Sequence, residues 1–369
     1  MSTTEFQTLG HWVLACAFLL SAVLGVFLHR THFCTMGAIS DVVHAGSWQR
    51  ANQWLLAIAF SCLGVGLISS FQLIEIERAS VVSNRLNWLS DAVGGLMFGA
   101  GMVLASGCGA KMLVRFGAGN LKSLLVLLVM GIGSFATLKG LTAVARVNTV
   151  DQFFWETPFA MTLPNALHHG LNLELPFQWV GLIFALGLMA FVLRNDQGRR
   201  PSTWLIGLAM GGLVTLAWLL SGYLGHVAEH PETLEDVLIK TNTNRMEAFT
   251  FVAPVAYTLD WIIHFSDANK VLTIGIMSVF GVIAGSHLSA RSLGQLKWES
   301  FADASDFKAH LVGAVLMGVG GVTAMGCTFG QGLSGLSVLS LNALIAVPFM
   351  VIGARLAFAY QHWSLERDV

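Results

Sequence analysis

The chain has 369 residues, of which 55% are hydrophobic and only 11% are charged. A soluble domain usually carries about 25% charge, so this composition excludes a soluble globular enzyme. Lys+Arg 20 against Asp+Glu 21 leave a net charge of −1, which excludes a basic face for nucleic acid. We therefore expect an all-α integral membrane protein that spans the lipid bilayer several times.

A transmembrane helix needs about 20 mostly apolar residues. Segments of this kind, some of them shorter, recur along the chain: His11–Leu28, Trp54–Ile74, Ser90–Ala105, Leu121–Leu138, Trp179–Leu193, Trp204–Gly222, Val271–Leu288, His310–Ala324 and Leu341–Tyr360. The first segment lacks a basic leader and a small-residue cleavage site, so we interpret it as a retained span rather than a signal peptide. Short spans that end in glycine-rich sequence predict broken or re-entrant helices.

The basic residues predict the orientation of the chain. Arg194, Arg199 and Arg200 form the densest basic cluster, which is typical of a cytoplasmic connector. The acidic connector around Glu229 and Asp236 then faces outward. Nine crossings place the N-terminus in the periplasm and the C-terminus in the cytoplasm. The long outer connector 139–176 carries no motif that assigns it a role.

An internal repeat is the strongest organisational signal. The segment VGGLMFGAGMVLASGC ends at Cys108 and VGAVLMGVGGVTAMGC ends at Cys327, 327 − 108 = 219 residues later. The same offset relates Thr31 to Thr250 and Asp41 to Asp260. We expect a single transmembrane domain over residues 1–360, with halves 9–138 and 204–360, a linking helix 178–193 and a cytoplasmic tail 361–369. An odd number of spans inverts the second half, and inverted repeats place a substrate site at the midplane.

Three of the five cysteines lie where the pattern predicts helix breaks. The four predicted breaks are His29–Asp41, Ser106–Gly117, Phe251–Asp260 and Gly326–Gly335. They contain Cys34, Cys108 and Cys327, and the glycines Gly107, Gly109 and Gly326 flank the last two. Cys16 and Cys62 lie in ordinary apolar helix, where cysteine packs as a small hydrophobe.

A thiol in apolar surroundings stays neutral and is a weak hydrogen-bond donor. Several weak donors along a path suit an anion that is held and then released. Helix N-termini at the breaks add partial positive charge, and a soft, polarisable sulfur anion matches such a site. These residues therefore favour an anion pathway.

Polar residues near the breaks support an anion. Arg30 precedes Cys34, while Lys111 and Arg115 follow Cys108, although each cation has the alternative of snorkelling to the interface. Gln331 is the polar candidate on the second-half break, with Ser334 beside it. For the paired Asp41 and Asp260, helix capping is a better interpretation than catalysis.

Two chemical alternatives lack support in the sequence. A copper path favours Met and Cys clusters at helical spacing, and a thiol–disulfide enzyme needs paired cysteines near a surface; neither pattern is present. The Walker A pattern GxxxxGK[ST] is absent as well. We therefore predict no metal, no cofactor and no enzymatic activity.

The motifs HRTHFCTMGAISD, ASGCGAKMLVRFGAGNLKSLL, FTFVAPVAYTLDW and MGCTFGQGLSGLSVLSLNALI resemble those of the YeeE/YedE family of sulfur-compound transporters. The resemblance spans about residues 9–360. It implies nine transmembrane helices in an hourglass with loops that enter from both faces. It also implies thiosulfate uptake across the bacterial inner membrane, relayed along Cys34, Cys108 and Cys327 by thiol hydrogen bonds. Family members often act beside a small TusA-like sulfur-carrier protein.

Two other functions stay open at this point. One is a pore or transporter for another small sulfur or selenium compound, and the other is an integral membrane thiol enzyme. The residues do not fix whether transport is passive or coupled, nor the oligomeric state.

Overall fold

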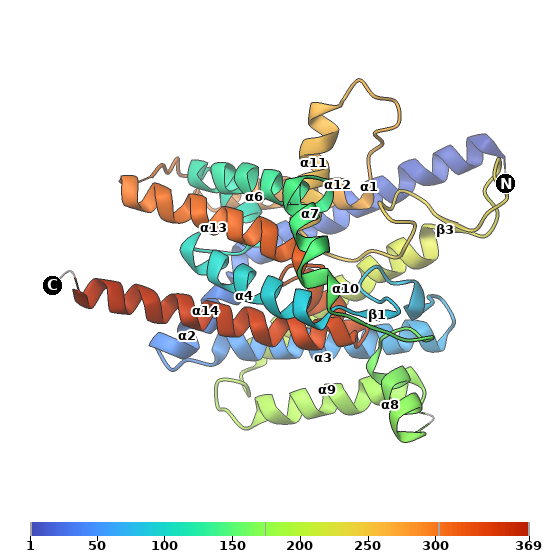
Figure 1. Cartoon of the computed structure of the whole chain (residues 1–369), viewed down its shortest axis with the longest axis horizontal. Helices are drawn as coiled ribbons and strands as arrows, with labels where there is room; N and C mark the ends of the chain where they lie inside the picture. The colour runs from blue at the N-terminus through green and yellow to red at the C-terminus, as the bar shows by residue number, and fades with distance from the viewer. Residues whose placement is uncertain (1, 174, 302, 368–369) are drawn as a thin grey trace.

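A computed structural model describes residues 2–173, 175–301 and 303–367, which form a helical bundle with two small sheets (Figure 1). The α-helices are α1 (Thr3–Thr31), α2 (Thr35–His44), α3 (Gln49–Ser70), α4 (Trp88–Leu104), α5 (Gly109–Gly117), α6 (Leu121–Lys139), α7 (Leu141–Asn148), α8 (Leu163–Leu171), α9 (Phe177–Leu193), α10 (Pro201–Leu219), α11 (Val252–Ile263), α12 (Ile274–Ser292), α13 (Ala304–Thr323) and α14 (Leu341–Arg367).

The remaining elements are short. Two antiparallel pairs of strands lie in the connectors: β1 (Arg85–Leu86) with β2 (Trp155–Glu156), and β3 (His226–Val227) with β4 (Val237–Leu238). The short helical turns are the 3₁₀ turns η1 (Ile76–Arg78) and η2 (Val150–Gln152) and the π-helical turns η3 (Leu220–Leu224) and η4 (Gly330–Gly335). The last helix, α14, continues beyond the predicted end of its span at Tyr360, and residues 368–369 of the predicted tail lie outside the described residues.

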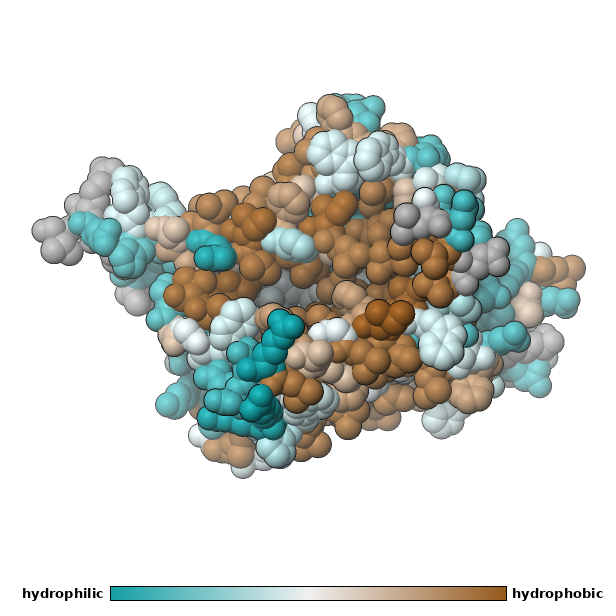
Figure 2. Space-filling view, turned by 90° about the horizontal axis from the view of Figure 1, so that it is seen from below, coloured by the Kyte–Doolittle hydropathy of each residue, from teal (hydrophilic) through white to brown (hydrophobic). Residues whose placement is uncertain are grey.

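Within the described residues, seven helical stretches are long and apolar enough to cross a membrane: Thr3–His44, Gln49–Ser70, Trp88–Gly117, Leu121–Lys139, Pro201–Leu224, Ile274–Ser292 and Leu341–Ser364. The predicted class of multi-pass helical membrane protein is confirmed. Two other predicted spans also form helices: α9 has 17 residues, and α13 begins with a turn that includes Asp306 and Lys308, which lower its mean hydropathy. Figure 2 shows one face of the molecule, hydrophobic over its middle and hydrophilic toward its ends.

The long helices run roughly along one axis, and the two termini lie at opposite ends of it (Figure 1). At the N-terminal end, the ring of Phe6 packs on His230 at 4.6 Å between centroids, and Ala79 forms a backbone bridge with Met246. Both strand pairs lie at this end in Figure 1. The connectors 75–87, 149–162 and 226–250 therefore gather together.

A second group of connectors gathers at the C-terminal end. The Trp48 N–H donates to Gln197 Oε1 at 2.7 Å, and Asn120 forms a backbone bridge with Glu299. The ring of His44 packs edge-on against Phe358 of α14 at 4.9 Å. Segments that are distant in the sequence thus lie in contact at this end of the bundle.

The repeated glycine segments form the central crossing of α4 with α13. A Cβ on Gly94 would lie 2.7 Å from the Gly320 carbonyl oxygen, and a Cβ on Gly101 would lie 2.7 Å from the Gly313 carbonyl oxygen. The two helices cross antiparallel, because Gly94, the earlier glycine of α4, meets Gly320, the later glycine of α13, and Gly101 meets Gly313. Glycine permits this approach because any side chain would meet backbone.

The two halves also end their helices in the same way. Ser106 after α4 and Met325 after α13 both adopt left-handed backbone, with φ of 58° and 55°. The next N–H in each half, of Gly107 and of Gly326, donates to a carbonyl five residues earlier at 2.8 Å. This reversal closes the helix and releases the chain toward the following cysteine.

Helix packing follows the same pairing. Helix α1 packs against α12, and helix α10 packs against α3. Likewise α14 packs on α4, and α6 packs on α13. The largest fully buried side chains include Trp218, Phe98, Phe251 and Phe329.

Candidate functional site

Cys34 and Cys108 each directly precede a short helix, and Cys327 lies three residues before a short π-helical turn. Cys34 is the N-cap of α2, Cys108 is the N-cap of α5, and Cys327 precedes η4. The carbonyl of each cysteine accepts the first hydrogen bond of that segment, from the N–H of Ala38 (2.9 Å), Met112 (3.0 Å) and Gln331 (2.7 Å). The thiols therefore lie beside unpaired N–H groups at helix starts, where the backbone carries partial positive charge.

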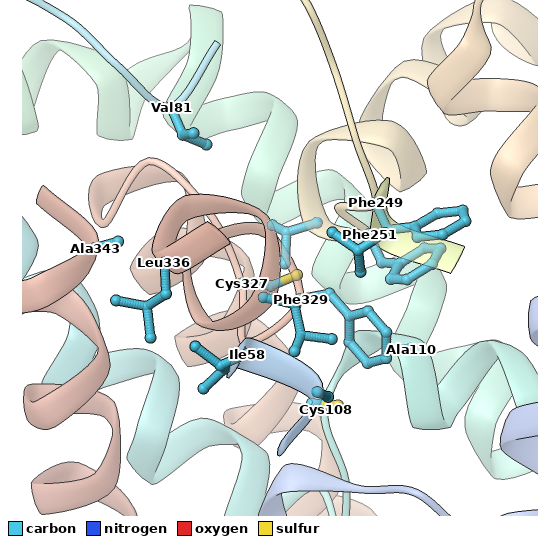
Figure 3. Packing of buried hydrophobic residues seen from close by; sticks show 14 of the residues in the cluster. Ile58, Val81, Cys108, Ala110, Phe249, Phe251, Cys327, Phe329, Leu336 and Ala343 are labelled. Carbon is cyan, nitrogen blue, oxygen red and sulfur yellow. The ribbon is translucent and has the colours of Figure 1, made fainter. Parts of the chain in front are cut away.

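All three sulfur atoms are buried in the centre of the bundle. Cys34 is 4% exposed, and Cys108 and Cys327 are each 1% exposed. The side chains of Cys34 and Cys108 interact through their thiols. Figure 3 shows Cys108 and Cys327 among the residues of one buried cluster.

Cys327 has two polar neighbours in the second half. The N–H of Gly330 points at its sulfur at 3.4 Å, and Thr250 Oγ1 lies 3.8 Å from the same atom. Thr250 is the repeat partner of Thr31, at the end of α1. The Cys327 sulfur thus accepts from one main-chain N–H and contacts one hydroxyl, and in that second contact either group can be the donor.

Lys111 contributes positive charge to the centre. It lies on α5, three residues after Cys108, and its charge acts on both the Cys34 and the Cys108 thiols. No carboxylate pairs with it in the part of the chain that the structure describes. Its stem packs on Gly107, where an added Cβ would lie 3.1 Å from the lysine Cγ. A half-buried cation that has no carboxylate partner among the described residues provides a site for an anion.

Of the other residues predicted for the site, the glutamine and the glycines lie in the buried interior, and Arg30 does not. Gln331 is fully buried, and its Nε2 donates to the Ala324 carbonyl at 2.8 Å. Its Cγ lies 3.1 Å from the position of a Cβ on Gly326, and Gly109 packs against Met130. Arg30 is exposed at the end of α1, so its guanidinium lies outside the buried cluster.

An aromatic cluster occupies the space around the cysteines. The ring of Phe329 lies at the centre of this cluster, 5.3 Å from Phe251, 5.6 Å from Trp54 and 6.3 Å from Phe33, measured between centroids. Figure 3 shows Phe249, Phe251 and Phe329 beside Cys327, with Cys108 beyond Phe329 in this view. These rings carry no motif or spacing that marks them in the sequence, although Phe33 and Phe329 lie within two residues of a cysteine.

Two cavities approach the thiols from opposite ends. The first, of about 260 Å³, opens among the N-terminal-end connectors and reaches Thr250 and Gly326 beside Cys327. The second, of about 480 Å³, opens at the C-terminal end and reaches Ser106 and Arg115 near Cys108. Arg115 Nη1 donates to the Ser106 carbonyl at 2.8 Å, which holds the guanidinium at the cavity wall.

Two side chains with ionisable groups line the first cavity. Arg146 and Glu247 both line it. Burial raises the pKa of the Glu247 carboxyl to about 7, against the opposing hydrogen bond that its Oε1 accepts from the Asn242 N–H at 2.9 Å. The charge of this entrance therefore changes near neutral pH.

Comparison of the sequence with models of known protein families shows which family this chain belongs to. A model of the sulphur transport family matches residues 30–356. The chain belongs to the sulphur transport family. This membership confirms the resemblance drawn from the cysteine motifs and indicates a transporter rather than an enzyme.

Two curated relatives of this family member are similar over nearly their whole length. A protein of Escherichia coli strain K12 described as thiosulfate transporter TsuA is 24% identical over 351 residues, which covers 90% of each chain. A protein of Spirochaeta thermophila with the same description is 25% identical over 346 residues, which covers 91% of this chain and 95% of the relative.

Asp41 and Asp260 do not cap helices in this family member, contrary to the sequence-based interpretation. Asp41 instead forms a two-pronged ion pair with Arg50 at the start of α3. Asp260 pairs with Lys270 in the connector before α12. Each carboxylate lies inside its short helix rather than at its N-cap, and it ties that helix to the segment that follows.

A metal centre has no support among the described residues. No group of three His, Cys, Asp or Glu side chains in ranges 2–173, 175–301 and 303–367 gathers as a metal site requires.

Proposed function

We propose that this protein imports thiosulfate across the bacterial inner membrane and passes it along Cys34, Cys108 and Cys327. Family membership supports this proposal, as do two relatives of similar length that are described as thiosulfate transporters. The observation that carries it is the set of three buried thiols, two of which, Cys34 and Cys108, lie near Lys111, a cation that has no carboxylate partner among the described residues. A bound anion supplies the negative charge that Lys111 lacks.

The relay follows from the weakness of each contact. A thiosulfate ion has a soft terminal sulfur that accepts an S–H donor, and each neutral thiol holds it only weakly. Weak, successive sites allow release as well as binding, which conduction requires. The interacting Cys34 and Cys108 thiols form two adjacent sites, while Cys327 lies beside the cavity that opens toward the N-terminal end.

We propose an architecture of nine crossings in two inverted repeats, with an hourglass path between them. The reciprocal glycine contacts of α4 with α13 support it, because Gly94 meets Gly320 while its repeat partner Gly313 meets Gly101. Reciprocal contacts of this kind are typical of a two-fold axis. The proposed domain covers residues 1–360, with halves 9–138 and 204–360 joined by the helix 178–193.

The proposed orientation places the N-terminal end in the periplasm. Arg194, Arg199 and Arg200 belong to the connector whose Gln197 contacts Trp48 at the C-terminal end. A basic connector favours the cytoplasmic side. Thiosulfate then enters through the cavity beside Cys327 and leaves through the cavity beside Arg115.

We also propose an acceptor on the cytoplasmic side, a TusA-like sulfur-carrier protein. A dianion moving inward opposes the membrane potential at about 2.3 kcal/mol per charge per 100 mV. Rapid removal of thiosulfate at the C-terminal end offsets part of this cost.

Growth of a thiosulfate-dependent auxotroph tests the relay. Cells that carry Cys34→Ala, Cys108→Ala or Cys327→Ala should grow poorly on thiosulfate and normally on cysteine. Cys16→Ala is the matched control, because Cys16 is a half-buried thiol on the apolar helix α1. Normal uptake by all three central variants would refute the thiol relay.

Competition distinguishes thiosulfate from other cargo. Uptake of radiolabelled thiosulfate should resist excess sulfate, sulfite or selenite, whereas a pore for another sulfur or selenium compound would be blocked by that compound. Recovery of chemically unchanged thiosulfate inside proteoliposomes would separate transport from turnover by a thiol enzyme.

A further inference from the structure

A third cavity, of about 470 Å³, lies between α2, α3 and α14 and is separate from both entrances. Its walls are almost entirely apolar, from the exposed Val43 at one end to the buried Trp54 and Ile58 at the other. Arg355 of α14 is the charged residue on its wall. Water needs two to four polar partners in such a space, and these walls offer few. The cavity therefore suits an apolar chain better than water.

A wider groove, of about 730 Å³, continues from this cavity along α14. The cavity and the groove share Val43 and Arg355 as wall residues. His44 and His362 also line the groove, and His362 Nδ1 lies 3.3 Å from the carboxylate of Glu366. An apolar pocket thus opens beside a rim that carries an arginine and two histidines.

Arg355 lies within a membrane-spanning stretch and is exposed there. It belongs to Leu341–Ser364, which is long and apolar enough to cross a bilayer. Across residues 2–173, 175–301 and 303–367, no carboxylate forms an ion pair with its guanidinium. An arginine inside a membrane span is costly unless an anion pairs with it. The charge of Arg355 therefore favours an anionic partner from outside the chain.

Exposed aromatic side chains mark the depth of Arg355 in the bilayer. Tyr360 and Trp363 follow it on α14 by five and eight residues, and both are exposed. Tyrosine and tryptophan are enriched where the bilayer meets water. Five helical residues span about 7.5 Å, so Arg355 lies just inside this interface and its guanidinium can snorkel toward the lipid phosphates. The cavity beside it lies at the depth of the acyl chains.

We propose that an anionic phospholipid binds at this place, with one acyl chain in the cavity between α2, α3 and α14 and its phosphate on Arg355. Basic pockets between membrane helices on the cytoplasmic side are typical sites for anionic lipid headgroups. The proposed orientation places this end of the bundle in the cytoplasm. A zwitterionic headgroup brings an ammonium group next to the guanidinium, so a headgroup of net negative charge, such as phosphatidylglycerol, fits better.

The bound chain supports the short helix that follows Cys34. Helix α2 has only ten residues and packs on α3 and α14, the two helices that form the rest of the cavity. An acyl chain fills space that the side chains of these helices leave open. Because a ligand of the folded state raises its stability, phosphatidylglycerol should raise the unfolding temperature of the protein.

Native mass spectrometry of the full-length protein, released from detergent, tests this site. From an equimolar mixture of phosphatidylglycerol and phosphatidylcholine, the wild type should retain one molecule of phosphatidylglycerol. Arg355→Gln should lower this occupancy about tenfold or more, since a hydrogen bond between charged groups contributes that much. Val351→Trp places a large side chain in the cavity and should reduce the binding of both lipids.

Arg291→Gln is the matched control. Arg291 is an exposed arginine near the end of α12, at the same end of the bundle, and it lines neither the cavity nor the groove. This variant should retain phosphatidylglycerol as the wild type does. In thermal unfolding, phosphatidylglycerol should stabilise the wild type and Arg291→Gln but not Arg355→Gln, and the transitions without lipid show that each variant is folded.

Three results would overturn the lipid site. The first is equal retention of the two lipids by the wild type, and the second is unchanged phosphatidylglycerol occupancy in Arg355→Gln. The third is a lipid-free dimer that dissociates in Val351→Trp, because a second copy of the chain would then cover this face. The measurements use no thiosulfate, so their outcome is independent of the proposed transport.

Discussion

Gly101 and Gly313 face each other across the crossing of α4 and α13, so that a Cβ on either residue would lie 2.7 Å from the carbonyl oxygen of the other. The crossing holds the ends of both helices next to the cysteines, because α4 leads to Cys108 and α13 leads to Cys327. The distance between these thiols thus depends on residues that never contact the cargo.

Gly101→Val and Gly313→Val should each destabilise the protein by about 1–3 kcal/mol or more, because the added side chain meets backbone that cannot move aside. Thermal unfolding of the detergent-solubilised protein measures this effect. Gly212→Ala on α10 is the control, since nothing lies within 4 Å of a Cβ there. Valine variants as stable as Gly212→Ala would contradict the close crossing.

Lys111→Gln should reduce thiosulfate uptake at least tenfold, because it removes a central positive charge that lacks a carboxylate partner among the described residues. Lys111→Arg should retain part of the activity. Initial uptake rates at low thiosulfate give the measurement.

Lys122 offers the comparison for this lysine, because its Nζ pairs with Asp306 at 2.6 Å. Lys122→Gln should alter uptake far less than Lys111→Gln. Equal effects of the two substitutions would indicate a general electrostatic contribution rather than a central anion site.

Uptake should fall as the external pH rises through about 7, because the pKa of Glu247 is raised to that value by burial. Below it the carboxyl is neutral, and above it a negative charge in the entrance cavity repels the incoming anion. Arg146 and Tyr257 line the same cavity.

Glu247→Gln should therefore give a flat profile between about pH 6 and pH 8, with rates near the wild-type value at low pH. Glu235→Gln, on an exposed residue of the same connector, should keep the wild-type slope. A slope that survives Glu247→Gln would assign the pH dependence to another group.

Phe329→Ala should open a leak, because this ring is the centre of the aromatic cluster around the thiols. We also expect a loss of stability of about 3–5 kcal/mol from the cavity that it leaves. Flux of small ions through proteoliposomes measures the leak. Phe98→Ala removes another fully buried ring, on α4, and should destabilise the protein without a leak.

Much of the fold could be predicted from local sequence. Apolar length predicted the helices, and the sequence Ser-Gly-Cys predicted the end of α4, because left-handed backbone at Ser106 and the bond from Gly107 depend on neighbouring residues. The repeat offset also anticipated the matching helix end at Met325. Patterns of this kind are encoded over a few residues or copied between the halves.

The tertiary structure alone decided which side chains meet. Asp41 pairs with Arg50 rather than capping a helix, and Arg30 lies at an exposed helix end although it is close to Cys34 in sequence. Arg146 of α7 and Glu247 of the connector before α11 line one cavity although they are far apart in the sequence. Sequence by itself determined the helices, their breaks and the three cysteines, whereas long-range packing determined the charges and donors that surround each thiol, since contacts between distant segments leave no local pattern.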